Sequence, residues 1–515
     1  MDPRVRFPLR LSRRPRQTPI RRRTAALLGA TALVLGSVGW ADAAKPPASA
    51  PFVNFSLAGT PPQAPGTTCP GSGSSCANGA AEPAIRAARD GSFYASSENG
   101  LGGGTLAWKS TDGGLHYSTL LSPNDVSGVG NTGFEPGGGD TDVAVAPVAN
   151  ASGRYNVYVS SLTLANVDVS TSTDGGATWT LHPITTPETL DDREWVAADG
   201  ASKICLSYHN APQGITVGCS TDAGATWLQY SPALDALHSF QTSENAIGNL
   251  AIDPASHTIY QIYSAITTAA ETACAPQLGV VAGTCDYHGV YMAVSTDGGL
   301  TFTDRTVYIN PNVMVGYGHQ FTNVSTDAAG NVYAVYGDNH IIWYSWSTNH
   351  GLTWSKPKQV SKSPASTAIF PWSVGGAAGK LDVVYYGSSY YDGVTVPDNY
   401  PASATWSVYF AQNLSATSPS GSFSQVAASP VVHTGGVCES GVACTGNRDL
   451  YDDFGVAANP RTGLASIVYS DDQYRNDASN APSSTCTAAG NNTASCDHTA
   501  IATQVSGKGI GITAP

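Results

Sequence analysis

The sequence has no long amphipathic helical pattern, which argues against a helical fold. No two of its ten cysteines have C-x-x-C spacing, so a zinc site is not expected. The cysteines instead fall into five pairs of close neighbours along the chain. We expect each pair to form a local disulfide in an oxidising compartment. The predicted disulfides are Cys69–Cys76, Cys205–Cys219, Cys274–Cys285, Cys438–Cys444 and Cys486–Cys496.

Positive charge is also scarce, with 25 Lys and Arg against 38 Asp and Glu. Nine of those basic residues are arginines within the first 23 positions, ahead of an apolar run over 25–40 and small residues at 41–43. This order is typical of a signal peptide covering residues 1–44, and the run is too short for a comfortable membrane span. A twin-arginine signal at 21–23 and a retained membrane anchor are the alternatives.

Removal of residues 1–44 leaves 16 basic and 36 acidic residues, a formal net charge of −20. Such a surface repels nucleic acid and anionic membranes, so we expect no nucleic-acid partner and no membrane insertion after signal removal. We expect a secreted or periplasmic monomer. No cofactor is required, although the many aspartates suit Ca²⁺.

One short phrase occurs five times in the chain. It reads S-T-D-G-G-L-H-Y from Ser110, S-T-D-G-G-A-T-W from Ser172, S-T-D-A-G-A-T-W from Ser220, S-T-D-G-G-L-T-F from Ser295 and S-T-N-H-G-L-T-W from Ser347. The intervals of 62, 48, 75 and 52 residues suit a multi-strand sheet with variable loops. Asp and Ser accept hydrogen bonds from nearby amides, Gly supplies a positive φ, and the final aromatic packs between sheets, so each copy predicts a hairpin turn.

This phrase resembles the Asp-box of the sialidase-like, or BNR-repeat, β-propellers. The resemblance implies that each box lies between the third and fourth strands of a blade, on the rim away from the active site. A second pattern of short strands and Gly-rich turns recurs in seven units between Glu82 and the C-terminal region. We therefore predict an all-β propeller of four-stranded antiparallel blades over residues 82–510. Seven blades are preferred, with a strand at 52–57 of the N-terminal segment 45–81 closing the ring, and six blades are the alternative.

Residues just before the innermost strands of a propeller converge on its axis, and in this chain many of them are acidic. Crowded carboxylates raise one another's pKa, as a general acid requires, but they also bind Ca²⁺ or simply cap turns, and these three interpretations stay open. The candidate catalytic residues are Asp192, Glu194 and Tyr451, and the candidate metal ligands are Asp140 and Asp142. The candidate substrate-binding residues are Arg86, Arg193, Arg448, His319 and Trp372.

The resemblance to sialidases implies an exo-α-sialidase-type glycoside hydrolase with three arginines clamping the substrate carboxylate. Residues 45–515 contain eight arginines, of which Arg86, Arg193 and Arg448 are the best placed. The sialidase phrase R-I-P has no direct match, because Arg86 follows Pro83. A non-catalytic propeller that binds glycan or protein, and a polysaccharide lyase on the same scaffold, are the alternative functions. In each case the expected partner is a glycan, a glycoconjugate or another protein.

Overall fold

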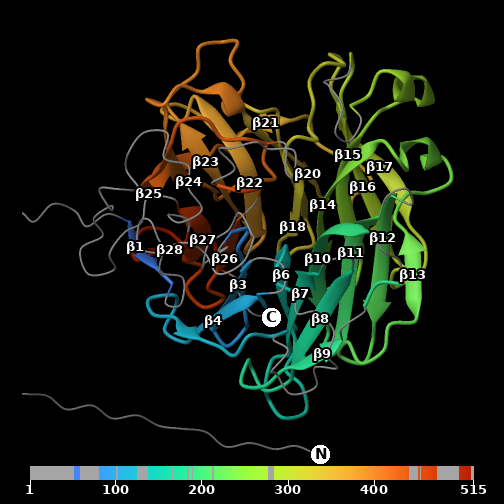
Figure 1. Cartoon of the computed structure of the whole chain (residues 1–515), viewed down its shortest axis with the longest axis vertical. Coiled ribbons are helices and arrows are strands. Elements are labelled where there is room, and N and C mark those ends of the chain that lie inside the picture. Colours follow the sequence, from blue (N-terminus) through green and yellow to red (C-terminus); the bar gives the residue numbers. More distant parts are fainter. Residues whose placement is uncertain are drawn as a thin grey trace, which may run out of the picture. The chain divides into compact units, whose positions relative to one another are not determined.

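A computed structural model describes residues 51–57, 81–99, 103–124, 137–163, 166–182, 185–187, 190–210, 214–276, 284–439, 450–452, 454–471 and 498–511. These residues form seven four-stranded antiparallel sheets, the blades of a β-propeller (Figure 1). The innermost strands of successive blades contact one another, and β26 contacts β2, so the ring is closed. The preferred prediction of seven blades is confirmed.

Each blade runs from an inner strand to an outer one in chain order, except in blade 7. The inner strands of blades 1–7 are β2 (Ala84–Ala87), β6 (Thr141–Val145), β10 (Asp191–Asp199), β14 (Asn245–Ile252), β18 (Asn323–Thr326), β22 (Thr367–Gly375) and β26 (Gly455–Ala458). The second strands are β3 (Phe93–Ser97), β7 (Val157–Leu162), β11 (Lys203–Asn210), β15 (Ile259–Ala265), β19 (Val332–Gly337), β23 (Leu381–Ser388) and β27 (Ala465–Asp471). The third strands are β4 (Leu106–Ser110), β8 (Val167–Ser172), β12 (Gly214–Ser220), β16 (Gly289–Ser295), β20 (Ile342–Ser347), β24 (Thr405–Asn413) and β28 (His498–Gln504). The outer strands are β5 (Ser118–Thr119), β9 (Thr180–His182), β13 (Gln229–Pro232), β17 (Thr303–Ile309), β21 (Lys358–Gln359), β25 (Ser424–Thr434) and β1 (Phe52–Ser56).

The ring is closed by the N-terminal strand. β1 pairs antiparallel with β28, with Phe52 opposite Gln504 and Ser56 opposite Ala500, so the first described strand completes the last blade. Figure 1 shows β1, in blue, beside the red strands of blade 7. This pairing ties the N-terminal strand to the last blade, with β1 as the outer strand of that sheet.

The hydrophobic core lies between neighbouring blades. Tyr158 and Val167 of blade 2, for example, pack with Val196 and Leu206 of blade 3. Helix is limited to three short 3-10 turns among the described residues: η1 (Ser239–Gln241), η2 (Ala269–Ala273) and η3 (Pro397–Asn399). None of the described helices is long and apolar enough to span a membrane.

The five repeated phrases form the turns between the third and fourth strands of blades 1–5. In every copy the Ser hydroxyl donates to the side-chain oxygen of the residue two positions on, at 2.7–2.9 Å, and accepts from the amide of the Gly four positions on. The same Asp or Asn oxygen accepts from the amide four positions further along. The prediction of a side-chain-stabilised turn is therefore confirmed.

The turn needs two residues of positive φ rather than one. Gly175 and Gly176 have φ of 78° and 93°, and the other copies follow the same pattern. Where the first Gly is replaced, Ala223 and His350 take left-handed conformations with φ of 62° and 56°. A side chain in this region is strained, so these two turns are less favourable than the glycine-containing ones.

Two predicted disulfides are confirmed. Cys205–Cys219 joins directly opposed residues of β11 and β12, and Cys274–Cys285 closes the loop between β15 and β16. Cys438 is also disulfide-bonded. Its predicted partner Cys444 lies outside the described residues, as do Cys69, Cys76, Cys486 and Cys496.

Candidate functional site

The amino-terminal ends of the inner strands gather acidic side chains around the axis, at the end opposite the repeated turns. We call this end the acidic face and the other end the hairpin face. The acidic face is built from residues of blades 1, 2, 3 and 7: Glu82, Asp140, Asp192, Arg193, Glu194, Tyr451 and Asp452.

Arg193 is the centre of this group. Its guanidinium donates to Glu82, at 2.5 Å, and lies 3.3 Å from Asp140, so it joins strands of three blades. It also packs 4.2 Å from the Phe321 ring, at the start of blade 5, and 5.3 Å from the Trp195 ring. Only 5% of Arg193 is exposed, so the arginine acts first as a structural cation that neutralises the two acids.

Several residues at the amino-terminal ends of the inner strands have left-handed backbone conformations. Arg193 sits in a β-bulge between Asp192 and Glu194 with φ of 54°. Glu82, Phe370 and Tyr451 have φ of 45°, 53° and 53° at comparable positions in blades 1, 6 and 7. Left-handed residues other than Gly cost energy and concentrate where geometry serves function, so their recurrence here marks this face as a functional candidate.

Glu194 is a buried carboxyl group with unusual surroundings. It is 1% exposed, and neither of its side-chain oxygens has a hydrogen-bond partner among the described residues. Burial, reinforced by the negative charge of Asp140, raises the pKa of Glu194 well above its usual range. The site therefore favours the neutral form of this carboxyl group, because an unpaired buried charge is far less stable.

Asp192 differs from Glu194 because its side chain reaches solvent. The surrounding protein still removes part of its hydration, and the charge of Asp140 adds to this effect, so the pKa of Asp192 is raised. Asp452 contributes further negative charge from blade 7, while Arg193 partly opposes the shift. A raised pKa keeps an accessible acid protonated to higher pH, which favours its use as a general acid toward a bound substrate.

A second polar group lies on the same face, between blades 4 and 6. His319 donates to Asp286 at 2.9 Å, and Gln320 donates to Glu439 at 2.7 Å. Although burial opposes protonation, the bond to Asp286 and the nearby acids raise the pKa of His319 to about 9. Burial raises the pKa of Glu439 to about 8. His319 is among the residues predicted from the sequence, whereas Asp286 and Glu439 are not, because they lie in no recognisable local motif.

A cleft of about 640 Å³ opens beside His319. Its walls include His340 and Tyr391, whose ring centroids are 4.2 Å apart, and polar residues such as Asn339 and Ser361. The segment 319–321 connects this cleft to the axis, because His319 lines the cleft while Phe321 packs on Arg193. A cleft with an exposed aromatic ring and many polar groups is suited to a sugar chain.

The structure places Arg86, Asp142 and Trp372 outside the group around Arg193. Arg86 pairs with Asp142 at 3.1 Å and lies 5.4 Å from the ring of Trp372, and both Arg86 and Trp372 line a cavity deeper along the axis. Arg448 lies outside the described residues. Asp140 and Asp142 each pair with a different arginine, so they do not face a common group, and Ca²⁺ at this pair stays a prediction.

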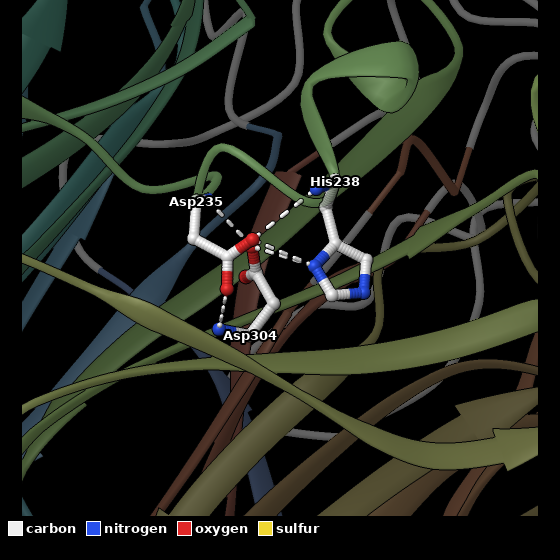
Figure 2. Close-up of side chains that lie close together, drawn as sticks. All are labelled: Asp235, His238 and Asp304. Atoms are coloured by element: carbon white, nitrogen blue, oxygen red, sulfur yellow. Dashed lines mark hydrogen bonds and ion pairs between the residues drawn. The ribbon is translucent and has the colours of Figure 1, made fainter.

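A separate cluster of Asp235, His238 and Asp304 lies between blades 3 and 4 (Figure 2). Asp235 and Asp304 each accept a hydrogen bond from the backbone amide of the other, and His238 donates to Asp235 at 2.9 Å. Burial, together with the charge of Asp235, raises the pKa of Asp304 to about 6. Both oxygens of Asp235 and Oδ2 of Asp304 accept these bonds, so the cluster fastens the loop after β13 to β17, while Oδ1 of Asp304 has no hydrogen-bond partner among the described residues.

No family model and no curated protein matches the sequence. Solved structures do match, among them the GH93 α-L-arabinofuranosidase of Fusarium graminearum in complex with arabinobiose, at 15% identity over 66% of this chain and 94% of that one, with a TM-score of 0.44. A GH74 xyloglucanase from Xanthomonas campestris is 14% identical over 81% of this chain and 52% of its own, with a TM-score of 0.45. A lectin from Aleuria aurantia in complex with a fucose-containing disaccharide is 12% identical over 69% of this chain and 96% of its own, with a TM-score of 0.38. The resemblance to sialidases therefore rests on the repeated turn alone.

Proposed function

We propose that the protein is a secreted glycoside hydrolase that acts on a glycan at the acidic face. The observation that carries this proposal is Asp192, a solvent-accessible carboxyl group of raised pKa beside the buried Arg193. The neighbouring cleft supplies a place for the rest of the sugar chain. The disulfides agree with an oxidising compartment outside the cytoplasm.

In the proposed mechanism Asp192 protonates the glycosidic oxygen of the leaving group. We assign the second group that glycoside hydrolysis needs on the other face of the sugar to blade 7, to Tyr451 or to Asp452, whose charge acts on Asp192. Glu194 lies below the surface, and burial raises its pKa, which favours the neutral form of its carboxyl group.

The substrate that we expect is neutral rather than sialylated. A sialoside requires several arginines free to clamp its carboxylate. Arg193 already binds Glu82 and Asp140, and Arg86 already binds Asp142. These two arginines would have to abandon buried partners before they could bind a substrate anion.

Turnover of a glycan panel tests the proposal. The purified protein would be incubated with arabinan, xyloglucan, neutral aryl glycosides and a fluorogenic sialoside, and released reducing ends or fluorophore would be measured. We expect hydrolysis of at least one neutral substrate, and a fall of about 10²–10⁴-fold in Asp192→Asn. Asp297→Asn is the matched control, because Asn349 already occupies the equivalent position in the fifth repeated turn.

Three outcomes would overturn parts of the proposal. Glycan binding without turnover would identify a non-catalytic binding propeller. An unsaturated product would identify a polysaccharide lyase. Hydrolysis confined to the sialoside would show that the inferred substrate class is wrong.

A further inference from the structure

The propeller axis contains a second cavity, at the hairpin face. It has a volume of about 1140 Å³ and is lined by the inner strands of all seven blades and by the turns that follow them. This volume slightly exceeds the roughly 300–1,000 Å³ that is usual for small-molecule sites. The cavity lies beyond Arg86 and Asp142, so it is separate from the acidic face.

The walls of this cavity are mainly aliphatic. Its lining includes Ala146, Val196, Ile252, Val374 and Ala457. Three polar residues of the lining already have hydrogen-bond partners: Ser325 and Ser373 bond each other at 2.9 Å, and Asn249 bonds both the amide and the carbonyl of Val324. Water in such a space finds few hydrogen-bond partners. An apolar ligand would instead gain binding free energy in proportion to the apolar surface that it removes from water.

Two arginines lie on one side of the opening of this cavity. Arg89, in the β2–β3 turn, and Arg461, in the β26–β27 turn, are exposed, and neither has an ion pair within the residues that the structure describes. The two turns touch, because a Cβ built on Gly91 would lie 3.8 Å from Nε of Arg461. In a chain with so few arginines, two unpaired ones at one cavity mouth are complementary to an anion.

The acids at the opposite side of the mouth do not compete for these arginines. Asp253 accepts from the amide of Ser256, and Asp327 accepts from Tyr333 and from the amide of Gly379. Both carboxylates are thus held inside turns of blades 4 and 5, and both residues are at most 3% exposed.

We propose that the cavity at the hairpin face binds an aliphatic carboxylate, with its apolar chain between the inner strands and its head group at Arg89 and Arg461. A sugar fits this space poorly, because the walls offer few free polar groups and the one large ring, Trp372, is covered by Arg86. The site is a binding site and does not depend on the proposed hydrolase activity.

Calorimetric titration with decanoate tests this site. The full-length protein should bind decanoate, and should bind decanol, which has the same chain without the charge, about tenfold more weakly. The double variant Arg89→Gln/Arg461→Gln should lose about tenfold in decanoate affinity and leave decanol binding unchanged. Arg154→Gln is the matched control, since Arg154 is exposed in the equivalent turn of blade 2 but does not line the cavity.

A second variant tests the apolar part. Ala251→Phe places a ring in the cavity from a partly buried position and should abolish binding of both decanoate and decanol. Thermal unfolding would check that each variant folds. No decanoate binding by the wild-type protein, or equal decanoate affinity in the wild type and the double arginine variant, would overturn the proposal.

Discussion

Arg193 of β10 donates to Glu82 ahead of β2, so an ion pair joins blade 3 directly to blade 1 and bypasses blade 2. Both side chains are at most 6% exposed. Asp140 of blade 2 also pairs with Arg193, with 3.3 Å between its carboxylate oxygen and the guanidinium nitrogen, so this one arginine links three blades.

Replacing Arg193 by Met should destabilise the protein by about 3–5 kcal/mol, because Glu82 and Asp140 would remain buried without their cation. Adding Glu82→Gln should recover part of this loss, so the double variant should be more stable than the sum of the two single losses predicts. Guanidinium-induced unfolding measures all three variants. Strictly additive losses would show that the two residues are not coupled.

The stability of the Glu194→Gln variant relative to the wild-type protein should increase as pH rises. The pKa of Glu194 is higher in the folded than in the unfolded protein, so its contribution is fully present below the unfolded pKa and is lost as pH rises toward the folded pKa. The amide cannot ionise and avoids this loss. Thermal unfolding between pH 5 and pH 8, chosen to lie above the ordinary glutamate pKa of roughly 4.3, should show a widening advantage for the variant, whereas a constant difference would contradict a raised pKa.

Asp297 should show the opposite dependence. Its bonds to Thr301 and Ser295 lower its pKa to about 2, so its stabilisation is present above the unfolded pKa and is lost as pH falls through the folded value. Asp297→Ala should therefore lower the unfolding temperature more at pH 7 than at a pH near that folded value. An equal loss at both would show that the carboxylate charge has no part in the turn.

Ala223→Gly should stabilise the third repeated turn by up to about 1 kcal/mol, because Ala223 has φ of 62° and Gly adopts this conformation without steric cost. Ala225→Gly, two positions on and outside the left-handed region, is the control and should be neutral or destabilising. Urea unfolding of the two variants measures the difference. Equal effects would indicate that left-handed strain is absent.

The fold was largely accessible from sequence because its signals are local. Ser, Asp and Gly at fixed spacing determine the repeated turn, and five turns establish the spacing of the blades. The strand over 52–57 was visible as a candidate for the same reason, and β1 occupies it.

The site was less accessible because it depends on contacts between distant segments. Arg86 and Arg193 look equivalent in sequence, yet the bulge at Asp192–Glu194 directs Arg193 to Glu82 while Arg86 pairs with Asp142 further along the axis. Ion pairs between different blades depend on how far along the axis each side chain lies and on the register of the strands. Short sequence motifs do not determine either.

The dependence of activity on the leaving group tests the role of Asp192 most directly. A glycosyl fluoride needs no protonation to depart, whereas a polysaccharide does. With Asp192→Asn, we predict that hydrolysis of the polysaccharide falls about 10²–10⁴-fold while hydrolysis of the matching glycosyl fluoride falls less than about tenfold. Equal losses on both substrates, or an undiminished rate on the polysaccharide, would contradict the assignment of Asp192 as the general acid.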